Sequence, residues 1–317
     1  MKTSFYIHLS AYLLILAACL QGPVDTQEAA STFTSLAAVT ESAPAVQSQT
    51  LSAADPSLTE TPSPGNPPRD FSPILYGGRV FQSTSFLLLG GVDGKGWLTP
   101  DESTASYSGE ATYSLHNMEH VGRYFLWGEA PEYSVTCGTY SVGTEADLDE
   151  AGFVGTLDGW DVTKRNVTEL SAEGEFYQQV VTDWLSTEGV SAPQIDSLQI
   201  FRVDIEGDGV DEVFVSAQRF ADETGHMTEA GDYSLVLMRK VTGDSVHTLS
   251  ILQDIYTSQE PELRFPFTYS ISNFIDLNQD GILEMVIEID RWEGFGAAVY
   301  RIDGQEVVQV LSQVCTL

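Results

Sequence analysis

The sequence predicts a mainly β protein, and three observations lead to this fold class. From Phe71 onward, short apolar and aromatic runs alternate with Gly, Asp and Pro, as in strands separated by turns. Only one segment, 169–190, has the periodicity of an amphipathic helix. Two acidic loops, beginning at Asp204 and Asp276, are each followed by an apolar run of strand character. We therefore expect a β-rich N-terminal region, one helix and two four-stranded repeat units.

The first 19 residues have the organisation of an export signal. Lys2 provides a positive charge, Ile7 to Leu16 is mostly apolar, and Leu16-Ala-Ala-Cys19 closes the segment with small residues before a cysteine. This resembles the lipobox of bacterial lipoproteins, which implies that Cys19 carries the lipid (palmitate) and anchors the protein to the membrane. The implied location is the bacterial cell envelope, facing the extracellular side or the periplasm. The alternatives are an ordinary signal peptide or a membrane helix, for which the apolar stretch is short.

Residues 20–70 are rich in Ala, Ser, Thr, Pro and Gln and have almost no aromatic side chains. Such a composition cannot bury a core, so this segment is predicted to be a disordered tether between the lipid and the folded domain. The net charge is −32, from 46 acidic and 14 basic residues spread along the chain. This charge excludes nucleic acid and anionic lipid as partners, because both are polyanions.

The N-terminal domain, 71–168, is predicted to be β-rich. Its strand candidates are Arg79–Phe81, Ser85–Leu89, Ala111–Leu115, Tyr124–Trp127 and Tyr133–Thr136. The helix follows at 169–190, with Ser171 as its N-cap and Gly189 just past its end. In an exported protein the two remaining cysteines, Cys137 and Cys315, are expected to form a disulfide. The alternative is a pair of unrelated thiols.

The C-terminal domain, 191–317, is predicted to contain two similar units. Each has four strand candidates, and an acidic loop joins the first candidate to the second. The candidates are Ser197–Asp204, Asp211–Ala217, Tyr233–Lys240 and Val246–Leu252, then Thr268–Asp276, Glu284–Ile289, Ala297–Ile302 and Glu306–Leu311.

Both loops have the spacing of a calcium site. Oxygen-bearing side chains stand at positions 1, 3, 5 and 9, a glycine at position 6 permits the sharp turn, and position 7 offers a carbonyl. An EF-hand would need a carboxylate at position 12 and a helix after the loop, whereas Val215 and Ile287 stand there, in strand-like runs. The remaining alternative is an acidic turn that binds nothing, and Glu206 at position 3 makes the first loop the weaker candidate.

From Gln194 to Leu317 the arrangement of strand, acidic loop and strand resembles the FG-GAP and VCBS-type repeats of integrin-like β-propellers. The resemblance implies blade-like units, but two units cannot close a propeller, so an open packing is expected. It also implies one or two calcium ions with two sets of ligands. These are Asp204, Glu206, Asp208, the Val210 carbonyl and Glu212, then Asp276, Asn278, Asp280, the Ile282 carbonyl and Glu284.

The sequence points to a surface-anchored, calcium-stabilised binding or structural lipoprotein, with an envelope protein or polysaccharide as its ligand. It leaves enzyme activity open. The alternative is a zinc-dependent cell-surface hydrolase, because His116, Glu119 and His120 match the H-x-x-E-H pattern. That pattern requires a helix, and here it lies between strand-like runs, where a polar hairpin turn is expected.

Overall fold

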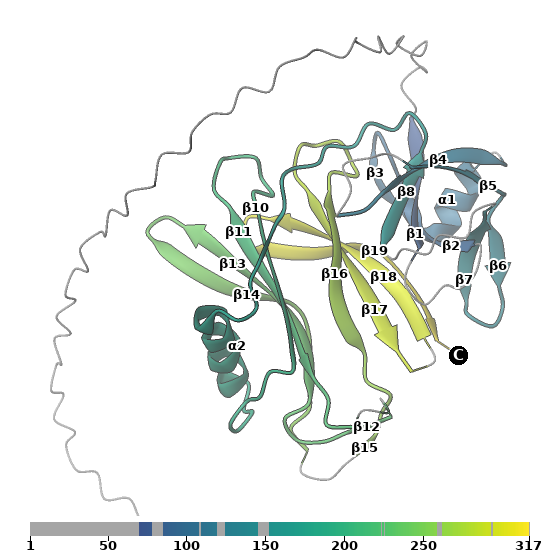
Figure 1. Ribbon diagram of the computed structural model, residues 1–317. Coiled ribbons are helices and arrows are strands. Elements are labelled where there is room, and N and C mark those ends of the chain that lie inside the picture. Colours follow the sequence, from purple (N-terminus) through teal and green to yellow (C-terminus); the bar gives the residue numbers. More distant parts are fainter. Residues whose placement is uncertain are drawn as a thin grey trace, which may run out of the picture. The chain divides into compact units, whose positions relative to one another are not determined.

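A computed structural model describes residues 70–77, 85–107, 109–118, 124–144, 152–222, 224, 226–258, 262–292 and 294–316. Strands make up 56% of the structure, which confirms the mainly β fold class (Figure 1). The predicted signal peptide with Cys19, the tether, the strand at 79–81, and Glu119 and His120 lie outside the described residues.

The first group of strands forms the N-terminal sheet, in the order β5-β4-β8-β1-β2-β7-β6, with β3 paired to β2. Helix α1, Pro100–Ser106, follows β3 and was not predicted. Its signal is nevertheless local, because the side chains and backbones of Thr99 and Glu102 form a capping box and Pro100 occupies the first turn. The strands are β1 (Phe71–Gly77), β2 (Ser85–Asp93), β3 (Gly96–Leu98), β4 (Ala111–His116), β5 (Tyr124–Gly128), β6 (Glu132–Ser134), β7 (Thr139–Gly143) and β8 (Phe153–Leu157).

The first repeat sheet contains the four predicted strands and one more, in the order β14-β13-β11-β10-β9. Helix α2, Glu175–Thr187, covers one of its faces through Val181 and Leu185. The N-cap of α2 is Gly174, without a side-chain hydrogen bond, so the prediction of Ser171 was wrong. The strands are β9 (Thr168–Leu170), β10 (Ser197–Val203), β11 (Glu212–Arg219), β13 (Tyr233–Thr242) and β14 (Ser245–Ile255), and β12 (Met227–Thr228) pairs separately with β15 (Glu262–Leu263).

The second repeat sheet is a simple antiparallel meander, β16-β17-β18-β19, and is drawn in yellow and yellow-green tones in Figure 1. Its strands are β16 (Thr268–Ile275), β17 (Glu284–Arg291), β18 (Gly294–Asp303) and β19 (Glu306–Thr316). In both repeat sheets the acidic loop joins the first two strands of the predicted unit, as the sequence indicates.

The second repeat sheet has a hydrophobic core on each face. Met285, Ile287 and Ile289 of β17 share one core with side chains of the first repeat sheet. Val286, from the alternate face of the same strand, shares a second core with Tyr76 of the N-terminal sheet. Because successive side chains of a strand point to opposite faces, β17 contributes apolar side chains to both cores. The sheets remain open, so the expectation of an unclosed packing holds.

Candidate cation sites

The first loop (204–212) and the second loop (276–284) have the same backbone construction. The first aspartate of each accepts amide hydrogen bonds from within its loop. Asp204 accepts from Gly207 (2.6 Å) and Gly209 (2.9 Å), and Asp276 accepts from Gln279 (2.7 Å) and Gly281 (3.0 Å). The glycine at position 6 has a φ of 87° in both loops, in the left-handed region that a glycine adopts without strain.

The glutamate at position 9 closes each loop from the following strand. Glu212 Oε2 accepts the amide of Ile205 at 3.1 Å, and Glu284 Oε2 accepts the amide of Leu277 at 2.8 Å. At position 5, Asp208 and Asp280 each accept the amide two residues further on, at 2.8 Å. In both loops, therefore, the acidic side chains hold the turn by accepting hydrogen bonds from backbone amides of the same loop.

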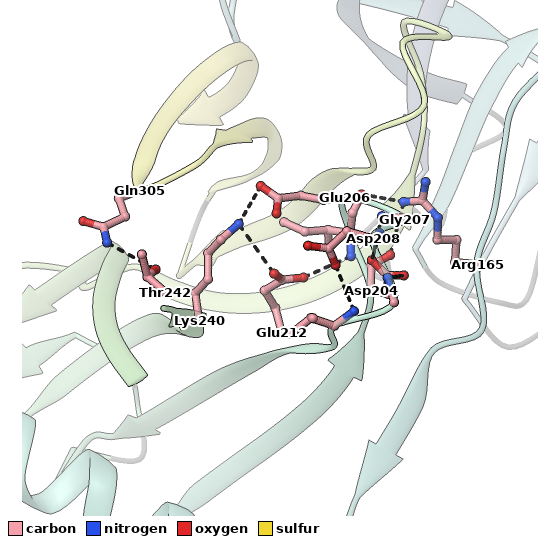
Figure 2. A network of polar contacts seen from close by, with 12 residues as sticks. Arg165, Asp204, Glu206, Gly207, Asp208, Glu212, Lys240, Thr242 and Gln305 are labelled. Atoms are coloured by element: carbon pink, nitrogen blue, oxygen red, sulfur yellow. Dashed lines mark hydrogen bonds and ion pairs between the residues drawn. The ribbon is translucent and has the colours of Figure 1, made fainter. Parts of the chain in front are cut away.

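The two loops are held together by direct contacts. The Leu283 amide donates to the Ile205 carbonyl at 2.9 Å. Arg165, from the segment before β9, donates to the carbonyls of Asp204 and Ile205 in the first loop and of Gly281 in the second (Figure 2 labels Arg165 beside the first loop). This arginine was not among the predicted site residues, because nothing in its local sequence ties it to loops 39 to 116 residues away.

In the first loop, a lysine forms ion pairs with two of the carboxylates. Nζ of Lys240, from β13, lies 2.5 Å from Glu206 Oε1 and 3.5 Å from Glu212 Oε1 (Figure 2). Lys240 is 7% exposed and Glu212 is 2% exposed, so this is a buried ion pair. Burial raises the pKa of Glu212, and the Lys240 charge opposes the rise. For Asp204, burial acts in the same direction, but the amides of the loop and the Arg165 charge together lower its pKa.

In the second loop, no cation is paired with the carboxylates in the part of the chain that the structure describes. Glu284 is fully buried, and its Oε1 atom has no hydrogen-bond partner among the described residues. Burial, with further contributions from the charges of Asp280 and Asp276, raises the pKa of Glu284 to about 8. Burial also raises the pKa of Asp276. Each of these shifts records a carboxylate that lacks a compensating positive charge.

The second loop can supply oxygen ligands, but they are not gathered around one point. Among the described residues, no three His, Cys, Asp or Glu side chains come close enough together to hold a metal ion. Asn278, at position 3, instead donates its amide to Asp280 at 2.9 Å. The orphaned Glu284 oxygen fits a hard cation, because an ionised carboxylate oxygen is a preferred calcium ligand.

The alternative zinc motif lacks the helix that it requires at its first residue. His116 is the last residue of strand β4 and is buried. Its Nε2 lies 3.0 Å from Thr156 Oγ1 in β8. Since Glu119 and His120 lie outside the described residues, the pattern remains a sequence match whose first histidine belongs to a sheet.

The structure places Cys137 and Cys315 at bonding distance, with their sulfur atoms 1.97 Å and their Cα atoms 4.5 Å apart. Cys137 lies in the turn between β6 and β7, and Cys315 lies in β19. This geometry is that of the predicted pair, and it would connect the N-terminal sheet to the second repeat sheet.

A cleft of about 920 Å³ lies beside the repeat sheets, with walls from β10, β11, β16 and β17. Its described lining combines hydroxyl, amide and carboxylate side chains with several apolar ones and contains no Lys, Arg or His. The residues are Asn117, Met118, Gly152, Val167, Glu169, Ser197, Leu198, Gln199, Phe201, Ser216, Gln218, Tyr269, Ser270, Ile271, Ser272 and Glu288.

No family model, curated protein or solved structure matches this chain. Neither helix among the described residues has the length and apolar character needed to cross a bilayer. The site therefore has to be interpreted from its own geometry.

Proposed function

We propose that this protein is a lipid-anchored component of the bacterial cell envelope that binds one calcium ion in its second loop. The ion has a structural role, and the protein acts as a binding or structural module. The proposal joins the lipobox at Cys19 and the spacing of the second loop to the environment of Glu284.

The observation that carries the calcium proposal is the buried, unpartnered Oε1 atom of Glu284. Leaving a carboxylate oxygen buried without a partner is costly, and buried charges in proteins are paired or coordinate metals. Asp276 and Asp280 belong to the same loop, and their charges add to this cost. A divalent cation would remove both the repulsion and the unsatisfied oxygen.

The proposed ligands are Asp276, Asn278, Asp280, the Ile282 carbonyl and Glu284. The amide hydrogen bonds to the three acids do not prevent coordination, because an ionised carboxylate offers about four lone-pair positions. Since the acids are not gathered around a point, we expect the second loop to contract when calcium binds. Such a site stabilises the strands on either side of it and supplies no catalytic group.

The open polar cleft supports a binding role. Hydroxyl and amide side chains with two carboxylates, Glu169 and Glu288, suit a neutral, hydroxyl-rich ligand and repel polyanions. An uncharged polysaccharide of the envelope has this character.

Calorimetry tests the calcium site. The purified protein, freed of metal by EDTA, is titrated with CaCl₂, and we expect a dissociation constant of about 10⁻⁴–10⁻³ M. Glu284→Gln should abolish this binding. Glu102→Gln is the matched control, because Glu102 also accepts a backbone amide at 2.8 Å but belongs to α1. Unchanged calcium binding by Glu284→Gln would exclude the second loop.

Fractionation tests the anchor. Cys19→Ala should release the protein from the membrane fraction or leave its signal peptide uncleaved. Ser35→Ala, in the predicted tether, is the control, since it leaves all three cysteines in place. Normal processing and membrane association of Cys19→Ala would contradict the lipobox.

A further inference from the structure

We propose that the ammonium group of Lys240 takes the place of a calcium ion in the first loop. The second loop, which has no such lysine among the described residues, binds calcium instead. The wild-type chain would then bind one calcium ion rather than two. This inference rests on the proposed function only for the second loop. For the first loop, the inference rests on the contacts of Lys240 with Glu206 and Glu212.

The ammonium group is placed by the pairing of β11 with β13. Val213 pairs with Arg239, so the next pair along the ladder sets Glu212 opposite Lys240. Side chains of directly opposed residues lie on the same face of a sheet. Lys240 thus lies beside Glu212 and also within 2.5 Å of Glu206, the residue at position 3. Its single positive charge is shared by two of the five acids of this loop, Glu206 and Glu212, and Arg165 binds the Asp204 carbonyl.

The second loop offers an internal comparison, because it has a basic residue at the equivalent place. Met285 pairs with Tyr300, which sets Glu284 opposite Arg301. No ion pair joins Arg301 to an acid of the second loop among the described residues, and Nε of Arg301 has no hydrogen-bond partner. The same pairing position therefore supplies a counter-charge in the first loop and not in the second.

The residue at position 3 accounts for part of this difference. It is Glu206 in the first loop, where its carboxylate pairs with Lys240, and the uncharged Asn278 in the second. Glu206 was expected to weaken the first loop as a calcium site because of its length. Its contact with Lys240 gives that expectation a physical basis.

The experiment is the calcium stoichiometry of matched variants, measured by calorimetry with CaCl₂ as the only added ligand. We expect one ion for the wild type, two for Lys240→Met, and one for Arg301→Met, the control at the equivalent position. In the double variant Lys240→Met/Glu284→Gln, the single remaining ion would occupy the first loop. Circular dichroism establishes that each variant is folded, and Lys240→Gln replaces Lys240→Met if the latter does not fold.

Two ions bound by the wild type would overturn the inference, because calcium would then displace Lys240. A folded Lys240→Met protein that still binds one ion would also overturn it. The two proposals fail separately. If the wild type binds no calcium but the double variant binds one ion, the second-loop proposal is wrong and the role of Lys240 stands.

Discussion

The first and second loops leave their sheets at equivalent strands, fold around an aspartate with the same amide contacts, and close with a glutamate at position 9. Their side-chain surroundings differ. Glu212 shares a lysine with Glu206, whereas Glu284 is buried with one oxygen unpartnered. The comparison teaches that two acidic loops of the same spacing share one backbone construction, while a residue from another strand, Lys240, supplies a positive charge to the carboxylates of the first loop.

The two repeat sheets also differ in what covers their faces. The second repeat sheet is buried on both faces, between the first repeat sheet and the N-terminal sheet, whereas the other face of the first repeat sheet meets α2. An uncompensated carboxylate is therefore more costly in the second loop, which is where a cation would stabilise the protein most.

The largest effect on stability should come from removing the disulfide between Cys137 and Cys315, which links the second repeat sheet to the N-terminal sheet. A disulfide spanning 178 residues stabilises by about 5 kcal/mol in the chain-entropy estimate. Replacing both Cys137 and Cys315 by Ser should lower the melting temperature by about 10–20 °C. Hydrogen exchange should show β18 and β19 losing more protection than β13 and β14. A reductant that leaves the melting temperature of the wild type unchanged would contradict the bond.

The second-largest effect should be the dependence of stability on pH, which we expect to come from Glu284 of the second loop. In calcium-free protein the pKa of Glu284 is raised from 4.5 to about 8, so the folded state holds this proton more tightly than the unfolded state. Stability should therefore fall as the pH rises from 4.5 to 8, by at most about 1.4 kcal/mol per pH unit. Urea unfolding in EDTA measures this slope. Calcium or Glu284→Gln should flatten it, and an equal slope in Glu284→Gln would assign it elsewhere.

The same substitution at position 9 should have opposite signs in the two loops. In EDTA at pH 8, Glu284→Gln removes a buried charge without a partner and should raise the free energy of unfolding. Glu212→Gln removes one partner of Lys240 and should lower it by about 1–3 kcal/mol. Denaturant titration of both variants measures the difference. Equal signs would refute the contrast between the loops.

The contact between the loops should depend on Arg165. Arg165→Met removes charge-assisted hydrogen bonds to carbonyls of both loops and should cost about 1.5–3 kcal/mol. Arg202→Met is the control, because Arg202 pairs with Asp211 at the surface and should contribute less than about 1 kcal/mol. Similar losses in the two variants would argue that Arg165 is an ordinary surface arginine.

The smallest effect should be the calcium response of position 5. At millimolar calcium, binding with the expected affinity stabilises by about 0.4–1.4 kcal/mol. Asp280→Asn should remove most of the calcium-dependent rise in melting temperature, and Asp208→Asn should leave it unchanged. A scan with and without calcium compares the two. Loss of the response in Asp208→Asn would show that the first loop also contributes.

The sequence predicts the parts of this fold that depend on neighbouring residues. Except for β9, which overlaps the segment predicted as helix, the strands of both repeat sheets, their acidic loops and α2 follow from alternation, turn residues and helical periodicity. Helix α1 could have been predicted as well, from Thr99, Pro100 and Glu102. Which sheet packs against which depends on many weak apolar contacts, and no short pattern records it.

In the candidate sites, too, local contacts can be predicted from the sequence and long-range contacts cannot. The loop residues are identifiable because their contacts span at most nine positions. Lys240 lies 28 residues beyond Glu212, and its proximity exists only once β11 and β13 pair in one register. Arg165 and the burial of Glu284 likewise require the assembled sheets. The sequence thus predicts two sites and marks the first as the weaker through Glu206, but the contact of that loop with Lys240 is found only in the tertiary structure.

The hydrogen bond from the Tyr76 hydroxyl to Glu288 can form in only one alignment of β17 against the N-terminal sheet. On one face of β17, Met285, Ile287 and Ile289 are all apolar, so displacing the strand by two residues would largely exchange one apolar side chain for another on that face. Such a displacement would put Val286 or Asp290 in the place of Glu288 and move Glu284 out of its loop. A buried tyrosine would then face an aliphatic side chain or a shorter acid. One polar pair between sheets can therefore exclude misaligned assemblies that hydrophobic burial alone would tolerate.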